Sequence, residues 1–243
     1  MIYIGNSKGE INSYGCEKEF EFKNFVNSEY SGIEVTCITL SKTGEYMLVG
    51  LKNGWIALWS CKRNACKKLI KTIFSTAVLD CKFLDNNKKT YSFIASDSQG
   101  NVHKILFEFG FFSDEVSYES LIKLDYPVYN IDIIFKNEEN KKLMLQQGSD
   151  TIACFVCLNM ILVCNIEPTL KKIFKFEKPK YYKDGQYVPN VSFGIGYIPY
   201  YTNESTADTN RSVDTSYLEN TFNYSKPQLL LAVSWGIIKY KIF

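Results

Sequence analysis

Residues 35–60, VTCITLSKTGEYMLVGLKNGWIALWS, decide the fold, because they hold three strand-like runs joined by two tight turns. The runs VTCITL, YMLVG and WIALWS are rich in β-branched, aromatic and other apolar residues, as strands are. Asn53 and Gly54 precede the third run, and an Asn-Gly pair is a strong hairpin signal because both residues tolerate a positive φ. The stretch therefore predicts a three-stranded antiparallel meander.

A meander of this size cannot bury its own faces and has to stack on similar units. The turn before its third strand recurs along the chain, at Gly9, Gly54, Gly100, Asn159 and Gly236. The first two intervals are 45 residues (54 − 9) and 46 residues (100 − 54). A period of about 40–45 residues with four strands per unit is typical of propeller blades. The sequence therefore predicts an all-β, WD-repeat-like β-propeller.

About five blades with ragged ends are expected, and strands a to d of each blade run from the centre of the ring outward. The first blade lacks a strand a and the fifth lacks a strand d, so residues 1–243 are predicted to form a single propeller domain or a fragment of a larger ring. Strand d of the second blade is expected at 68–73, and strand b of the fourth at either 143–146 or 151–158. Residues 201–225 are polar and lack periodicity, which predicts a disordered insertion in the fifth blade.

The composition describes a globular chain of 243 residues that is 46% hydrophobic and 22% charged, with a net charge of +2. No apolar run approaches the roughly 20 residues that a membrane span needs, and the amino terminus lacks the regions of a signal peptide. We therefore expect a cytoplasmic location, where the five of the eight cysteines that lie in strand-like runs are buried free thiols. Cys154 and Cys157 should point to opposite faces of one strand, so no metal site is predicted.

No enzymatic chemistry is predicted. His103 is the only histidine, so it has no second histidine with which to build a metal site or a catalytic relay. The sequence contains no phosphate-binding loop, dinucleotide-binding turn or nucleophile elbow. Without a convergent acid, base and nucleophile, neither catalytic residues nor a cofactor is expected.

The turn and third strand of the second blade provide the candidate functional residues. Trp59 is predicted to lie in the core between stacked blades, and Gly54 and Gly100 are predicted to be structural turn residues. Trp55 begins the same strand as Trp59, so it is expected near the rim, where exposed aromatic residues mark interfaces. The candidate partner contact consists of Lys52, Asn53 and Trp55.

The a–b and c–d loops of antiparallel blades lie on one face of the ring. On this face the sequence predicts ten lysines and arginines against four acidic residues. Two interpretations stay open: a solubilising surface that prevents edge pairing, and a contact with anionic lipid headgroups. Nucleic acid is not expected as a partner, because the basic loops carry no interleaved aromatic residues for base stacking. The lipid contact is assigned to Lys62, Arg63, Lys67, Lys68, Lys88 and Lys89.

Several motifs follow one another in an order that resembles a known family. They are GLKNGWIALWS, STAVLDCKFLDNN, SFIASDSQGNVHKILFE, ILVCNIEPTLKKIFKF and LLLAVSWGIIKYKI. The first resembles a WD repeat, with Trp59-Ser60 where Trp-Asp is usual and without the Gly-His pair that normally precedes it. Together they are similar to the amino-terminal propeller of the vacuolar protein sorting-associated protein 8 family, the Rab-binding subunit of the CORVET endosomal tether.

This resemblance implies a non-enzymatic scaffold that takes part in endosomal vesicle fusion and trafficking. Its implied partners are a GTP-loaded Rab GTPase of the early-endosome type and other Vps tether subunits, and its implied location is cytoplasmic and peripheral on endosomal membranes. No residue that contacts the Rab is transferred from the family. The alternative is a generic WD-repeat scaffold, such as a coat or other trafficking subunit, whose partner is a helix or peptide of another protein.

Overall fold

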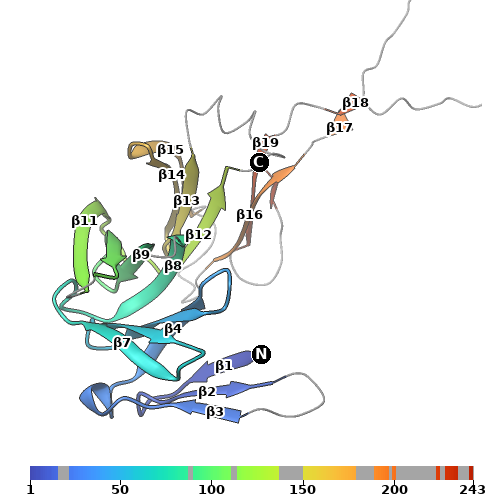
Figure 1. The fold of residues 1–243 in the computed structure, drawn as a ribbon. Coiled ribbons are helices and arrows are strands. Elements are labelled where there is room, and N and C mark those ends of the chain that lie inside the picture. Colours follow the sequence, from blue (N-terminus) through green and yellow to red (C-terminus); the bar gives the residue numbers. More distant parts are fainter. Residues whose placement is uncertain are drawn as a thin grey trace, which may run out of the picture.

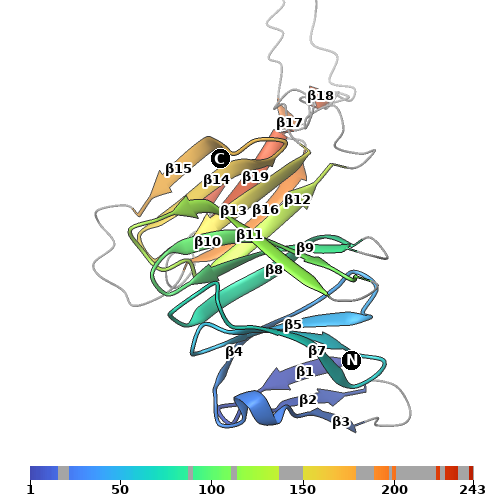
Figure 2. The same cartoon turned by 60° about the vertical axis from the view of Figure 1, so that its left-hand side comes forward.

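The computed structural model describes residues 1–15, 22–86, 90–110, 114–136, 150–178, 189–196, 199–200, 223–224, 228–234 and 241–242. Apart from one turn of 3-10 helix, η1 (Ser28–Tyr30), the regular elements of this part of the chain are strands. They form antiparallel sheets, which are the blades of a propeller arc. Figure 2 shows blades 1 to 4 stacked in chain order, from the amino-terminal sheet at the bottom upward.

The strands fall into five blades and one short ribbon. Blade 1 contains β1 (Ile2–Gly5), β2 (Ile11–Tyr14) and β3 (Phe22–Phe25). Blade 2 contains β4 (Val35–Leu40), β5 (Tyr46–Leu51), β6 (Ile56–Ser60) and β7 (Ala65–Ile70). Blade 3 contains β8 (Val78–Asn86), β9 (Thr90–Asp97), β10 (Asn101–Glu108) and β11 (Glu115–Lys123). Blade 4 contains β12 (Asn130–Phe135), β13 (Thr151–Val156), β14 (Met160–Glu167) and β15 (Lys171–Glu177). Blade 5 contains β16 (Asn190–Gly196), β19 (Gln228–Ser234) and β20 (Lys241–Ile242), and the ribbon pairs β17 (Pro199–Tyr200) with β18 (Asn223–Tyr224).

Each strand of a blade pairs antiparallel with the next strand of the same blade. The first strands of blades 2 to 5, which are β4, β8, β12 and β16, contact one another in that order and form the inner side of the arc, and β1 lies beside β4 (Figure 1). The predicted fold class, an all-β partial propeller, is confirmed by this architecture.

The structure corrects or decides three details of the predicted strand positions. The outer strand of blade 2 begins at Ala65 and not at 68, because the turn from β6 is only four residues long (61–64). Strand b of blade 4 is β13, so the alternative 151–158 is correct, while 143–146 lies outside the described residues. Most of the predicted insertion, 201–222, also lies outside them, whereas Asn223 and Tyr224 form β18.

The core lies between the blades, because each central blade buries both of its faces. Met47 and Leu48 are neighbours in β5, and both are fully buried. Met47 packs in a cluster with Trp59 and with Phe25 of blade 1, whereas Leu48 packs in a cluster with Phe93 of blade 3. Successive side chains of a strand point to opposite faces, so a strand between two blades needs apolar residues at nearly every position. This requirement explains the nearly continuous apolar sequences of β5 and β6.

The turns between the second and third strands of blades 2 and 3 need glycine. Gly54 has φ +89°, and a Cβ added there would lie 2.6 Å from the carbonyl oxygen of Phe74 in the linker to blade 3. Gly100 has φ +82°, and a Cβ there would lie 2.5 Å from the carbonyl oxygen of Tyr126 in the linker to blade 4. Each turn is therefore pressed against the linker that leads to the next blade.

The aligned turn of blade 4 differs. Asn159 is absent from the residues of the described chain that have a positive φ, and the Cys157 N–H donates directly to the Met160 carbonyl over 2.8 Å. Gly236, which the sequence aligns with these turns in blade 5, lies outside the described residues.

Candidate functional site: the loop surface over blades 1 and 2

The predicted partner contact, Lys52 to Trp55, is the turn between β5 and β6. Backbone hydrogen bonds fix it on the linker that enters blade 2, since the Lys52 N–H donates to the Glu34 carbonyl over 2.9 Å. Within the turn, the Gly54 N–H donates to the Leu51 carbonyl over 3.1 Å, and the Trp55 N–H donates to Asn53 Oδ1 over 3.2 Å. The turn therefore presents its side chains from a rigid backbone.

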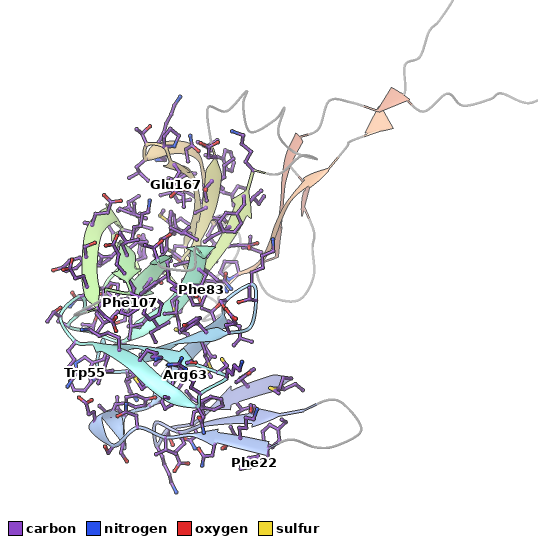
Figure 3. All side chains as sticks on the ribbon, viewed as in Figure 1. Phe22, Trp55, Arg63, Phe83, Phe107 and Glu167 are labelled. Carbon is purple, nitrogen blue, oxygen red and sulfur yellow. The ribbon has the colours of Figure 1, made fainter. Side chains whose placement is uncertain are left out.

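Charged side chains surround this turn in pairs of opposite sign. Lys52 Nζ lies 2.7 Å from Glu34 Oε2, and Lys71 Nζ lies 2.8 Å from Glu29 Oε2. Lys71 Nζ also lies 4.8 Å from the ring centroid of Trp55, a cation–π geometry. The four charged side chains are exposed, so these ion pairs add little to stability. Their effect is to orient side chains around a half-buried indole at the edge of blade 2 (Figure 3).

A depression of about 310 Å³ lies beside the turn, where blades 1 and 2 meet. Its lining combines the turn of blade 1, the linker into blade 2 and the turn of blade 2, and consists of Ser7, Gly32, Ile33, Glu34, Lys52 and Asn53. Small-molecule sites are deep and mostly apolar, whereas the surface of a protein interface combines polar groups with a few aromatic anchors. The depression with Trp55 nearby is therefore suited to a protein partner.

Trp59 lies four residues further along, and its side chain is only 2% exposed. Its ring packs edge-on against Phe25, with centroids 5.6 Å apart, and its Nε1 donates a hydrogen bond to the Tyr30 hydroxyl over 2.8 Å. Burial raises the pKa of Tyr30 above its ordinary value. Trp59 therefore holds blade 2 to blade 1, and through Tyr30 it supports the linker below the candidate surface.

The residues predicted to face a membrane are only partly together. Lys62 and Arg63 are exposed in the turn between β6 and β7, and this turn meets the one between β4 and β5 through a hydrogen bond from the Cys61 N–H to the Glu45 carbonyl (2.9 Å). Lys67 and Lys68, which are assigned to the same basic face, both lie within β7 and are half-buried. Lys88 and Lys89 lie outside the described residues. Among the other basic residues assigned to this face, Lys136 forms an ion pair with Asp150.

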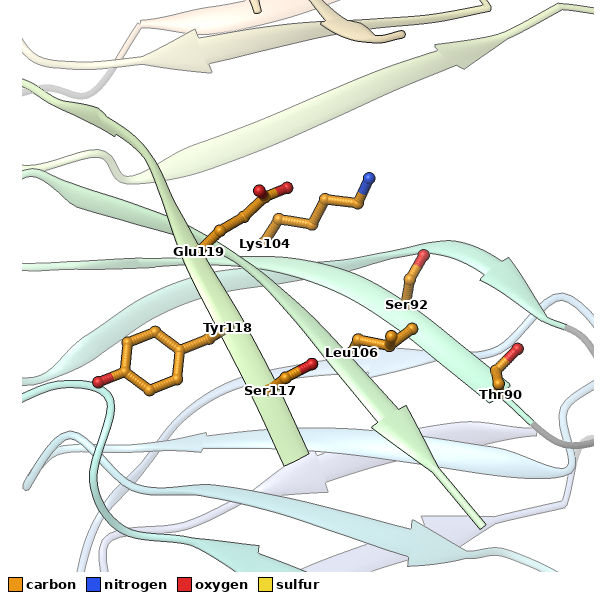
Figure 4. Close-up of a pocket in the computed structure, with 7 residues that line it drawn as sticks. All are labelled: Thr90, Ser92, Lys104, Leu106, Ser117, Tyr118 and Glu119. Atoms are coloured by element: carbon orange, nitrogen blue, oxygen red, sulfur yellow. The ribbon is translucent and has the colours of Figure 1, made fainter. Parts of the chain in front are cut away.

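A second cavity, of about 450 Å³, opens beside blade 3 (Figure 4). It is lined by Thr90, Ser92, Lys104, Leu106, Ser117, Tyr118 and Glu119. Figure 4 shows Lys104 and Glu119 pointing to the same side of the blade. Lys104 Nζ is bound by Glu167 Oε1 of blade 4 at 2.8 Å, so it ties two blades together at the cavity wall. None of the described residues that line the cavity is a histidine or a cysteine.

His103 and the cysteines have packing roles in the described part of the chain. The His103 ring lies between Phe74 and Tyr118, with centroid distances of 5.1 and 5.6 Å, and burial lowers its pKa. Cys154 and Cys157 belong to different core clusters, as strand alternation requires. No group of three or more histidine, cysteine, aspartate or glutamate side chains among the described residues could hold a metal ion. No helix in that part of the chain is long and apolar enough to cross a membrane.

Sequence reasoning did not identify the linker residues of this surface, namely Glu29, Glu34 and Lys71. Glu29 and Lys71 are 42 residues apart, so no local pattern relates them. Glu34 and Lys52 are 18 residues apart and follow the Val35–Leu51 pair of β4 and β5, so the predicted meander could have related them. The repeated turn glycines could have indicated where the linkers lie. A glycine that recurs in the same turn of each blade indicates that another backbone segment, here the linker, packs closely against that turn.

The comparison with protein families agrees with this architecture. The family described as Vps8 beta-propeller matches residues 1–218. No curated protein matches the chain. The matched segment includes blades 1 to 4, the linker residues and the turn that carries Trp55. The resemblance is thus confirmed, and the chain belongs to the Vps8 β-propeller family.

Proposed function

We propose that this propeller is a non-enzymatic docking module of a vacuolar sorting tether, and that it binds a GTP-loaded Rab GTPase of the early-endosome type through the loop surface over blades 1 and 2. Membership of the Vps8 β-propeller family supports the role in tethering. The observation that supports the choice of surface is Trp55, a half-exposed indole on a rigid turn beside a depression between blades. Endosomal vesicle fusion and contact with other Vps tether subunits are part of the same proposal.

The surface has the features of an energetic centre in a protein interface. Tryptophan is enriched among the residues that contribute most to binding, above all where polar groups around it exclude water. The hydrogen bonds that the Lys52 and Trp55 backbone N–H groups donate keep the turn in place, so the turn loses little conformational entropy on binding. The charges of Glu34 and Lys52 are paired in the free protein, which leaves a nearly neutral rim around the indole.

Binding to a purified early-endosome Rab tests the proposal. The Rab is loaded with a non-hydrolysable GTP analogue or with GDP, immobilised, and exposed to the chain. We expect binding to the GTP form only. Trp55→Ala should raise the dissociation constant about tenfold or more, since loss of an aromatic anchor costs at least about 1.4 kcal/mol.

Tyr118→Ala is the matched control, because Tyr118 is an exposed aromatic residue (52%) of blade 3 that does not line the depression. It should bind like the parent. Equal affinity of the parent and Trp55→Ala would refute the assignment of this surface. Equal binding to the GTP-analogue form and the GDP form of the Rab would favour the alternative function, a generic scaffold whose partner is a helix or peptide of another trafficking subunit.

A second proposal concerns the opposite face of the arc, where Lys62 and Arg63 are exposed. We infer that this end of blade 2 contacts anionic membrane and orients the propeller at an endosomal surface. Each lysine or arginine near such a surface contributes about 1 kcal/mol. Two exposed charges give only a weak contact, so this face would assist a protein-mediated location and would not replace it.

A further inference from the structure

Two cysteine side chains meet between blades 2 and 3. Cys37 lies in β4 and Cys81 lies in β8, the first strands of these blades, which are neighbours on the inner side of the arc (Figure 1). Their Sγ atoms are 3.5 Å apart, and both thiols are free. The two residues are 44 positions apart in the chain, so the contact depends on how the two blades stack.

The backbone of blade 2 holds Cys37 in this position. The register of β4 shifts between Val35 and Cys37, and Cys37 lies opposite Gly50 of β5. A Cβ added to Gly50 would lie only 2.4 Å from Cys37 Sγ, so the absence of a side chain there leaves the space that the sulfur occupies. The same Cβ would lie 2.8 Å from Val78 Cγ1 at the start of β8. The glycine therefore allows the sulfur of blade 2 to approach blade 3.

The two thiols differ in their access to solvent. Cys81 is fully buried in the cluster between blades 2 and 3, whereas Cys37 is half-buried and packs against that cluster. The hydrogen bond with Cys37 and burial raise the pKa of Cys81 well above its ordinary value, and the negative charge of Asp80 raises it further. The thiolate is the reactive form of cysteine. Cys37 is therefore the residue that reacts first with an oxidant, and Cys81 is its protonated neighbour.

We propose that Cys37 and Cys81 are a redox-modification site, at which hydrogen peroxide links the two sulfurs in a disulfide bond between blades 2 and 3. The Cys37 thiolate attacks one oxygen of the peroxide, becomes a sulfenic acid and releases hydroxide, which takes up the proton that Cys37 lost. The Cys81 thiol then attacks the Cys37 sulfur, and its proton leaves with the sulfenic hydroxyl group as water. Each sulfur loses one electron overall, and the two electrons reduce one peroxide to two waters.

The disulfide would connect two blades that otherwise meet only through non-covalent contacts. The sulfurs of a disulfide lie about 2.05 Å apart, so these two have to approach each other by about 1.5 Å. The bond would close a loop of the chain that contains β5, β6 and β7 of blade 2. Such a loop restricts the unfolded chain, so the oxidised protein should resist unfolding more than the reduced protein does. A dithiol such as dithiothreitol should reverse the bond by exchange.

Peptide mapping of the purified chain tests this proposal without a variant. The chain is reduced, freed of reductant, treated in its folded state with a small excess of hydrogen peroxide, alkylated, and digested with trypsin under non-reducing conditions. Cys37 is the only cysteine of the tryptic peptide 24–42, and Cys81 is the only cysteine of the peptide 72–82. Mass spectrometry should find these two peptides linked, two hydrogen atoms lighter than their sum, and dithiothreitol should separate them.

Cys66→Ala is the matched control, because Cys66 is another half-buried free thiol of blade 2 and its loss leaves the pair intact. Peroxide should link the two peptides in this variant as in the parent, and it should shift the urea midpoint of both proteins upward. Cys37→Ala should show neither effect. A bond from Cys37 to any other cysteine, or oxidation of Cys37 to a sulfinic acid without a link, would overturn the proposal. An equal shift of the urea midpoint in Cys37→Ala would also overturn it.

Discussion

Trp59 Nε1 donates a hydrogen bond to the Tyr30 hydroxyl over 2.8 Å, and this contact joins β6 of blade 2 to the helical turn that follows blade 1. Both side chains are buried, at 2% and 0% exposure, and their rings meet edge-on with centroids 6.5 Å apart. Twenty-nine residues separate the two along the chain. The pair therefore fixes the linker whose later residues line the candidate partner surface.

We expect Trp59→Ala to lower the free energy of unfolding by about 3–5 kcal/mol, since it leaves a cavity between two blades. Tyr30→Phe should cost about 1–3 kcal/mol, because it leaves the buried indole N–H without an acceptor. Urea denaturation followed by tryptophan fluorescence and circular dichroism measures both changes. The double variant Trp59→Ala with Tyr30→Phe should cost less than the sum of the two single changes. Strict additivity would contradict the energetic coupling of the pair.

Gly54→Ala and Gly100→Ala should each destabilise the fold more than an alanine in an ordinary turn does. Both glycines have a positive φ, and an added Cβ would lie within 2.6 Å of a linker carbonyl oxygen. Gly44→Ala is the control, because Gly44 has φ +71° but has nothing within 4 Å of its added Cβ. Thermal unfolding should place the two variants below this control. Equal melting temperatures for all three variants would contradict this prediction, because they would mean that the linker backbone shifts to admit the added Cβ with no loss of stability.

His103 predicts a dependence of stability on pH. Burial lowers its pKa in the folded protein, so protons bind the unfolded chain more readily than the folded chain. The free energy of unfolding, as far as it depends on His103, is therefore highest at pH values above the unfolded pKa of about 6.5. It falls as the pH decreases toward the folded pKa. Because His103 is the only histidine, unfolding of the parent and of His103→Gln between neutral and mildly acidic pH isolates the effect. A parallel pH dependence of the two proteins would contradict it.

Binding to anionic vesicles should depend on Lys62 and Arg63 and should weaken as salt rises, since exposed charges are screened. Co-sedimentation with phosphatidylserine vesicles measures it, with Lys62→Gln/Arg63→Gln as the test variant. Lys52→Gln is the control, because it removes one charge on the opposite loop surface and should leave vesicle binding unchanged. Equal sedimentation of the parent and the double variant would leave these residues with a solubilising role.

The sequence by itself determined the propeller. Strand alternation and turn residues act within a few positions, so the stretch around Asn53 and Gly54 specifies a meander wherever it occurs. The same short-range logic located the other blades, identified Trp59 as an aromatic residue between sheets, and placed Cys154 and Cys157 on opposite faces. The motif order also identified the family, which the match over residues 1–218 confirmed.

Only the tertiary structure decided which side chains meet across blades. Lys71 pairs with Glu29, Lys104 pairs with Glu167, and Trp59 Nε1 donates to the Tyr30 hydroxyl. Each of these contacts joins different blades or the linkers between them, and no sequence period relates the two residues. Because the turn of four residues after β6 is enough to reverse the chain, β7 begins at Ala65. Lys67 and Lys68 therefore lie in a strand and not in the basic loop surface predicted from the sequence. Long-range pairing depends on how the blades stack, and this stacking is set by burial of whole sheet faces and not by local propensity.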